Sequence, residues 1–94
     1  MSQLGLEALL KPKSIAVIGA SQKVGRAGHL MMKNLLAGGF SGAILPVNPN
    51  YSAVCGVMAY PCIAALPIVP DLAILCTHAR HLAQLLDEIG RAHV

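Results

Sequence analysis

The most informative stretch of this chain is SIAVIGAS at residues 14–21. The residues between Ser14 and Gly19 are apolar and rich in β-branched side chains, which is typical of a buried strand. Gly25 and Gly28 follow, and a helical spacing of apolar residues then begins. A strand that leads through a glycine-rich turn into a helix presents backbone N–H groups at the positive helix end, where a phosphate is stabilised. The stretch therefore predicts a phosphate-binding turn.

Further strands and helices are predicted after this turn. Residues 25–37 have helical spacing and end at a Gly-Gly pair, which is a common helix stop. Residues 42–47 (GAILPV) and 71–76 (DLAILC) predict two more strands, with Pro46 expected at a strand end because proline lacks an N–H. The connections at 54–58 and 61–67 are predicted as a short extended segment and an irregular or helical segment. Leucine-rich spacing also predicts a short helix before Pro12 and a last helix through Leu82, Leu85, Leu86 and Ile89.

This order of elements predicts an α/β domain built on a parallel sheet with right-handed crossovers. Ligands of such sheets bind where the carboxyl ends of the strands meet. Residues 19–21, 48–51 and 76–78 converge on that edge. Ser21 is either a hydroxyl donor to a phosphate or an ordinary helix-entry residue.

The glycines and the loop cations each have two interpretations. Gly19, Gly25 and Gly28 do not have the GxGxxG spacing of the dinucleotide fingerprint, so they either shape a phosphate loop or only allow a tight turn and close packing of the helix on the strand. Lys23 and Arg26 either add charge for an anion or are merely solvated. An NAD site normally has an acid at the end of the second strand, and this strand ends in PVNP, which counts against NAD.

Composition excludes several other classes of protein. The chain has 94 residues, 55% hydrophobic and 12% charged, with a net charge of +3, which predicts one small folded domain. Glycines and prolines interrupt the uncharged segment at 34–70, so no membrane span is predicted. No signal peptide is predicted either, so a cytoplasmic location is expected. Scattered basic residues and 3% aromatic residues disfavour nucleic acid and favour a small anionic ligand.

No metal site or disulfide framework is predicted. The three cysteines are odd in number and widely spaced, and the four histidines have no metal-ligand spacing. No pair of nucleophile and base or of carboxylates can be assembled, so we expect no catalytic residues in this chain.

Several stretches carry a family resemblance: PKSIAVIGAS, NLLAGGFSGAILPVNPNY, VCGVMAYPCIAALP and PDLAILCT. The chain resembles, nearly end to end, the N-terminal CoA-binding domain of NDP-forming acyl-CoA synthetases. Within that family, LEALLKPKSIAVIGAS and RAGHLMMKNLLAGGF resemble most closely the bacterial Pat-type protein lysine acetyltransferases. The resemblance implies a Rossmann-like parallel sheet with flanking helices and coenzyme A, or an acyl-CoA, as the ligand.

The resemblance also implies which residues bind the ligand. Residues 19–21 would form the first phosphate-facing loop, residues 48–51 would flank the adenosine phosphates, and residues 76–77 would line the path of the pantetheine arm. Together with the loop residues, the candidate cofactor-binding residues are Gly19, Ala20, Ser21, Lys23, Gly25, Gly28, Asn48, Pro49, Tyr51, Cys76 and Thr77.

The chain ends where domains of this family continue into a further strand and helix. We therefore expect residues 1–94 to be a truncated CoA-binding domain with a sheet that is incomplete at the C-terminus. Its expected partners are CoA and either the remaining synthetase domains or a second copy of the chain. Two alternatives stay open: an NAD(P)-binding fragment of an oxidoreductase, and a noncatalytic interaction remnant whose exposed sheet edge pairs with a partner strand.

Overall fold

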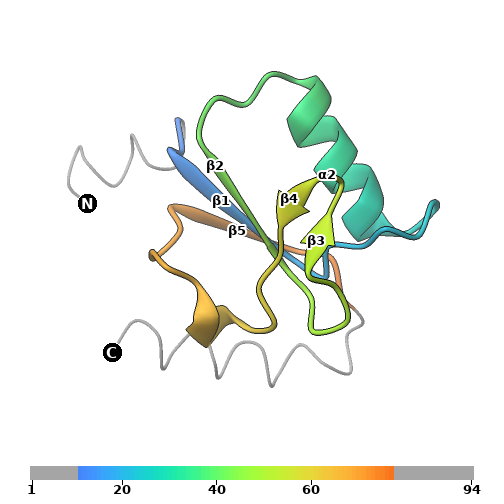
Figure 1. Cartoon of the computed structure of the whole chain (residues 1–94). Coiled ribbons are helices and arrows are strands. Elements are labelled where there is room, and N and C mark those ends of the chain that lie inside the picture. Colours follow the sequence, from blue (N-terminus) through green and yellow to red (C-terminus); the bar gives the residue numbers. More distant parts are fainter. Residues whose placement is uncertain (1–10, 78–94) are drawn as a thin grey trace.

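The computed structural model describes residues 11–77, and the helices predicted nearer the two ends of the chain lie outside the described residues. Figure 1 shows these residues as a small sheet with a helix and a hairpin packed beside it. The elements in chain order are β1 (Ser14–Ile18), α2 (Ala27–Ala37), β2 (Ala43–Val47), β3 (Ala53–Val54), β4 (Val57–Met58), the 3-10 helix η1 (Ile63–Ala65) and β5 (Leu72–Leu75).

The three longer strands form one parallel sheet in the order β2-β1-β5. All five residues of β1 are buried, which explains its central place, since a strand in the middle of a parallel sheet is covered on both faces. Helix α2 connects β1 to β2 as the crossover that parallel neighbours require. The predicted α/β fold with a Rossmann-like parallel sheet is thus confirmed.

Alternate side chains of β1 enter two separate apolar clusters, one on each face of the sheet. Val17 packs with Met32 of α2 and Val54 of the hairpin, all three fully buried. On the opposite face Ile18 packs with Ile63 of η1. This alternation follows from the period of two in a strand, and it fixes α2 and η1 on opposite faces of the sheet.

Pro46 occupies the next-to-last position of β2, opposite Val17 of β1, and is fully buried. Its carbonyl accepts a hydrogen bond of 2.9 Å from the Tyr60 N–H, on the side of β2 away from β1. The N–H and C=O of one residue in a strand point to the same side, so the N–H that proline lacks would not have bonded to β1. An edge position of this kind accommodates proline without breaking the ladder.

The segment predicted as extended at residues 54–58 is an antiparallel hairpin, in which Ala53 pairs with Met58 and Val54 with Val57. Its two turn residues, Cys55 and Gly56, have φ of 52° and 83°. Positive φ at both central residues is the signature of the tight turn that matches the twist of two-residue hairpins. A cysteine rarely adopts this conformation, which is why the sequence did not indicate the turn.

A buried serine at the start of the central strand forms a hydrogen bond with the residue before β5. Ser14 Oγ accepts a 2.9 Å hydrogen bond from the Asp71 N–H, and Asp71 Oδ2 accepts one of 2.8 Å from the Lys13 N–H. We expect Ser14→Ala to lower the free energy of unfolding by about 1 kcal/mol, since it leaves the Asp71 N–H without this partner. Urea unfolding measures the change. Ser41→Ala, at an exposed position, is the control, and an equal loss in both variants would contradict this role.

Candidate functional site

The structure brings the three strand ends together at one edge of the sheet. The Gly19 N–H donates to the Val47 carbonyl at 2.9 Å, and the Cys76 N–H donates to the Ile18 carbonyl at 2.7 Å. The loops that follow β1, β2 and β5 therefore lie side by side, with the loop after β1 in the middle. This is the place where ligands bind to open α/β sheets.

Two glycines allow the backbone segments at this edge to approach one another closely. Gly19 has φ of 88°, and a Cβ there would lie 2.6 Å from the carbonyl oxygen of Cys76. A Cβ at Gly28, near the start of α2, would overlap the carbonyl oxygen of Gly19. Both positions thus support the packing interpretation, and they also bring the amino end of α2 against the end of β1. Gly25 is different, because a Cβ there would meet nothing within 4 Å. Its φ of 91° is therefore the only feature that favours glycine, and glycine serves the turn alone.

The loop between β1 and α2 combines buried and exposed positions. Ser21 is 7% exposed, and its Oγ accepts a 3.0 Å hydrogen bond from the Lys23 N–H. The side chains of Lys23 and Arg26 are exposed, and Arg26 is the N-cap residue of α2. The first turn of α2 contains no acidic residue, so the positive end of the helix dipole is not opposed there. The loop is electrostatically suited to an anion.

Asn48 holds the loop after β2 against the loop after β1. Its Nδ2 donates to the carbonyl of Ala20 at 2.8 Å, and its Oδ1 accepts from the Asn50 N–H at 2.9 Å. Because both ends of the side-chain amide are used within the protein, Asn48 acts as a positioning residue here. Ala20 itself has no exposed surface, and its carbonyl accepts the bond from Asn48, so this residue packs inside the edge.

The remaining candidate residues lie at the same edge with different exposure. Pro49 is exposed, whereas Tyr51, Cys76 and Thr77 are half-buried. Tyr51 and Cys76 also pack against the apolar cluster on the α2 face of the sheet. All eleven candidate residues therefore belong to the carboxyl edge or to the α2 end that abuts it.

Burial raises the pKa of the Cys76 thiol above its ordinary value. A raised pKa leaves less thiolate at a given pH, and the thiolate is the reactive form. We expect iodoacetamide at pH 8 to modify Cys76 more slowly in the folded chain than in the urea-unfolded chain, with the rate rising as the pH is raised. Peptide mass spectrometry measures this, and equal rates in the two states would contradict it.

Gln22 is a residue of the site that sequence reasoning missed. Its Oε1 accepts a 3.0 Å hydrogen bond from the Cys55 N–H at the tip of the β3–β4 hairpin. This bond ties the loop after β1 to a hairpin 33 positions further along the chain. No local pattern could have indicated it, because the hairpin itself depends on an unusual turn residue.

Two negative findings apply to the described residues. No helix within residues 11–77 is long and apolar enough to cross a membrane. The same part of the chain contains no group of three or more histidine, cysteine or acidic side chains placed to hold a metal ion.

A parallel sheet with a glycine-lined carboxyl edge and a helix that starts there defines the class of nucleotide-binding α/β domains. Residues 13–94 match the family described as "CoA binding domain", so the chain belongs to this family. The prediction of coenzyme A as the cofactor is thereby confirmed at the level of the family.

Curated relatives show where this domain occurs. The chain is 40% identical over 89 residues to acetate--CoA ligase [ADP-forming] I of Archaeoglobus fulgidus, covering 95% of this chain and 13% of the relative. It is 38% identical over 95 residues to the alpha subunit of acetate--CoA ligase [ADP-forming] I of Pyrococcus furiosus, covering 97% of this chain and 21% of the relative. The chain thus spans only a small part of these relatives.

Solved structures agree with this assignment. Acetyl-coenzyme A synthetase 1 of Ca. Korarchaeum cryptofilum, solved with phosphate and ADP, superposes with a TM-score of 0.88 at 33% identity, covering 93% of this chain and 19% of that one. A conserved hypothetical protein from Pyrococcus furiosus superposes with a TM-score of 0.79 at 30% identity, covering 87% of this chain and 69% of that one. The chain is therefore similar to the CoA-binding domain of NDP-forming acetyl-CoA synthetases, and the two alternatives of an oxidoreductase fragment and an interaction remnant are not favoured.

Proposed function

We propose that this chain holds coenzyme A, or an acyl-CoA, at the carboxyl edge of its sheet, as the CoA-binding part of an NDP-forming acyl-CoA synthetase. The observation that carries the proposal is the convergence of three strand ends around Gly19, next to the amino end of α2. The match of residues 13–94 to the CoA-binding family supports it. Transfer of an acyl group is proposed for a larger protein, because this chain covers only 13% and 21% of two synthetases to which it is similar.

The loop after β1 would hold the phosphates. Backbone N–H groups at the start of α2 and the hydroxyl of Ser21 would donate to phosphate oxygens, since a hydroxyl that accepts one bond still donates another. Lys23 and Arg26 would add positive charge from the exposed rim. Gly25 would keep the loop in its turn conformation.

The other two loops would contact the rest of the ligand. Residues 48–51 would flank the adenosine phosphates, with Pro49 exposed and the side chain of Asn48 holding the loop in place. Cys76 and Thr77 would line the path of the pantetheine arm. Desolvation keeps the Cys76 thiol protonated by raising its pKa, which suits a lining role better than a nucleophilic one.

The particular parent protein is a further part of the proposal. The stretches LEALLKPKSIAVIGAS and RAGHLMMKNLLAGGF support a Pat-type protein lysine acetyltransferase, in which a synthetase-like region accompanies an acetyltransferase domain. The proposed partners are the remaining synthetase domains or a second copy of the chain, and the proposed location is the cytoplasm. Residues 1–94 would then act as one CoA-binding domain.

Calorimetric titration of the chain with CoA and, separately, with NADH tests the proposed function. We expect saturable binding of CoA and none of NADH. We expect Ser21→Ala to weaken CoA binding by about tenfold, because a hydrogen bond to a charged group contributes about 1.5 kcal/mol or more. Ser41→Ala, at an exposed serine before the amino end of β2, is the matched control. Preferential binding of NADH would contradict the proposal.

A further inference from the structure

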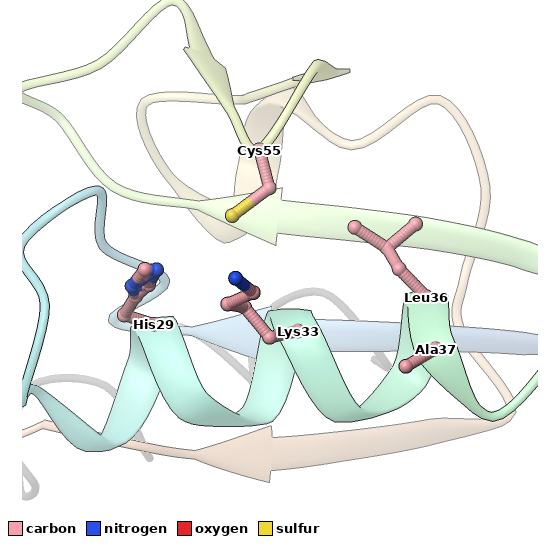
Figure 2. Close-up of a pocket in the computed structure, with 5 residues that line it drawn as sticks. All are labelled: His29, Lys33, Leu36, Ala37 and Cys55. Atoms are coloured by element: carbon pink, nitrogen blue, oxygen red, sulfur yellow. The ribbon is translucent and has the colours of Figure 1, made fainter.

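A cavity lies between α2 and the β3–β4 hairpin. Its volume is about 550 Å³, and its lining residues are His29, Lys33, Leu36, Ala37 and Cys55. Figure 2 shows His29, Lys33 and Leu36 extending from α2 toward the hairpin, and the thiol of Cys55 extending back toward the helix. None of these five residues belongs to the candidate CoA-binding set, although the Cys55 N–H bonds to Gln22 in the loop after β1.

One end of this cavity is basic. His29 and Lys33 are four positions apart on α2, so their side chains lie on the same face of the helix. Asp71 is the sole carboxylate within residues 11–77, and it is bonded to Lys13 and Ser14 at the amino edge of the sheet. Within the described part of the chain, the positive charge of Lys33 is therefore not offset by a nearby acid.

The other end of the cavity is apolar, and the β3–β4 hairpin forms the wall opposite α2. Leu36 is 44% exposed, although it is a large hydrophobic side chain, and Ala37 lies beside it. Val54 anchors the hairpin in the core with no exposed surface, and the bond from the Cys55 N–H to Gln22 holds the tip. The hairpin side of the cavity is therefore held at both Val54 and Cys55.

We propose that this cavity binds a small organic anion, with its charged group between His29 and Lys33 and its apolar part against Leu36 and Ala37. Cavities of about 300–1,000 Å³ are typical of small-molecule sites. The charged group is a carboxylate or a phosphate monoester, because both are anionic acceptors that a lysine ammonium and an imidazole N–H bind. The site goes beyond the proposed binding of CoA and does not depend on it.

Alkylation of Cys55 by neutral iodoacetamide reports occupancy of the cavity, since the thiol lines it. Peptide mass spectrometry measures the rate of alkylation of Cys55 in the chain without substitutions. Cys62, at the start of η1, is the internal reference. The probes are hexanoate, hexyl phosphate and hexylammonium, which share an alkyl chain and differ in charge. We expect both anions, or one of them, to slow the labelling of Cys55 in a saturable manner, while hexylammonium has no effect. The more effective anion identifies the charged group.

Matched lysine variants connect the protection to the cavity. We expect Lys33→Gln to weaken the protection by about three- to fivefold, as for loss of one partly solvated ion pair. Lys13→Gln removes the same charge at the opposite edge and is expected to leave the protection unchanged. Equal protection by hexylammonium, protection of Cys62 to the same extent, no protection by either anion, or equal effects of the two variants would each overturn the inference.

A parallel titration with CoA separates this site from the proposed function. We expect Lys33→Gln to bind CoA as the unchanged chain does, and saturating CoA to leave the protection of Cys55 by the anion in place. Displacement of the anion by CoA would overturn the inference, because the cavity would then be part of the CoA site. Failure of the chain to bind CoA would contradict the proposed function and leave the expected protection of Cys55 as it is.

Discussion

Gly28→Ala is expected to destabilise the domain strongly, although alanine normally stabilises a helix interior by about 1 kcal/mol relative to glycine. A Cβ at this position overlaps the carbonyl oxygen of Gly19, which is backbone and is itself held by the hydrogen bond from Gly19 to Val47. Overpacking against such a rigid neighbour costs about 3 kcal/mol. We therefore expect the midpoint of thermal unfolding to fall by roughly 10–20 °C.

Gly25→Ala is the matched control for this prediction. Gly25 also belongs to the loop region, but a Cβ there meets nothing within 4 Å, so its φ of 91° is the sole obstacle. We expect a loss of about 1 kcal/mol, the usual effect of placing a side chain in the left-handed region. Circular dichroism during heating compares the two variants. A smaller loss for Gly28→Ala than for Gly25→Ala would show that α2 does not lie this close to β1.

Asn48→Asp is expected to weaken the binding of CoA by about 30-fold. The substitution removes the Nδ2 donor to the Ala20 carbonyl, worth about 1 kcal/mol, and places a negative charge beside the proposed phosphate loop, worth about 1 kcal/mol more. The acceptor for the Asn50 N–H remains, so the loop after β2 keeps its own turn. Calorimetric titration with CoA measures the change in affinity.

Asn50→Asp separates the effect of charge from that of position. It adds the same charge two residues further along the same loop, at an exposed side chain, and leaves the bond between Asn48 and Ala20 intact. We expect a loss of about fivefold, from charge alone. An identical loss in the two variants would mean that the contact between the loops does not position the site.

The parallel sheet could be predicted because each strand has its own local signal. The apolar runs at residues 14–19, 42–47 and 71–76 correspond to β1, β2 and β5, and the helical spacing before Gly38 corresponds to α2. Rules on crossovers and on strand ends then placed the three loops at one edge. The family and its cofactor followed from sequence stretches at these same positions, and the family match confirms both.

Contacts between distant parts of the chain could not be predicted in this way. The hydrogen bond from Asn48 to Ala20 spans 28 positions, and that from Cys55 to Gln22 spans 33. The hairpin was predicted as an extended segment without its turn, because cysteine is uncommon at positive φ. The cavity beside α2 depends on that hairpin, so no sequence pattern indicated it. The sequence also left two roles open for Gly28, and the overlap with Gly19 supports close packing.

The chemical shifts of backbone amides during a titration of the ¹⁵N-labelled chain with CoA show directly which edge of the sheet holds the ligand. We expect saturable shifts of the amides of residues 19–26, 48, 50–51 and 76–77, and none at Lys13 and Asp71, which lie at the opposite edge of the sheet. Shifts centred on the amino edge, or the absence of saturable shifts in a folded chain, would contradict the claim that the carboxyl edge holds CoA.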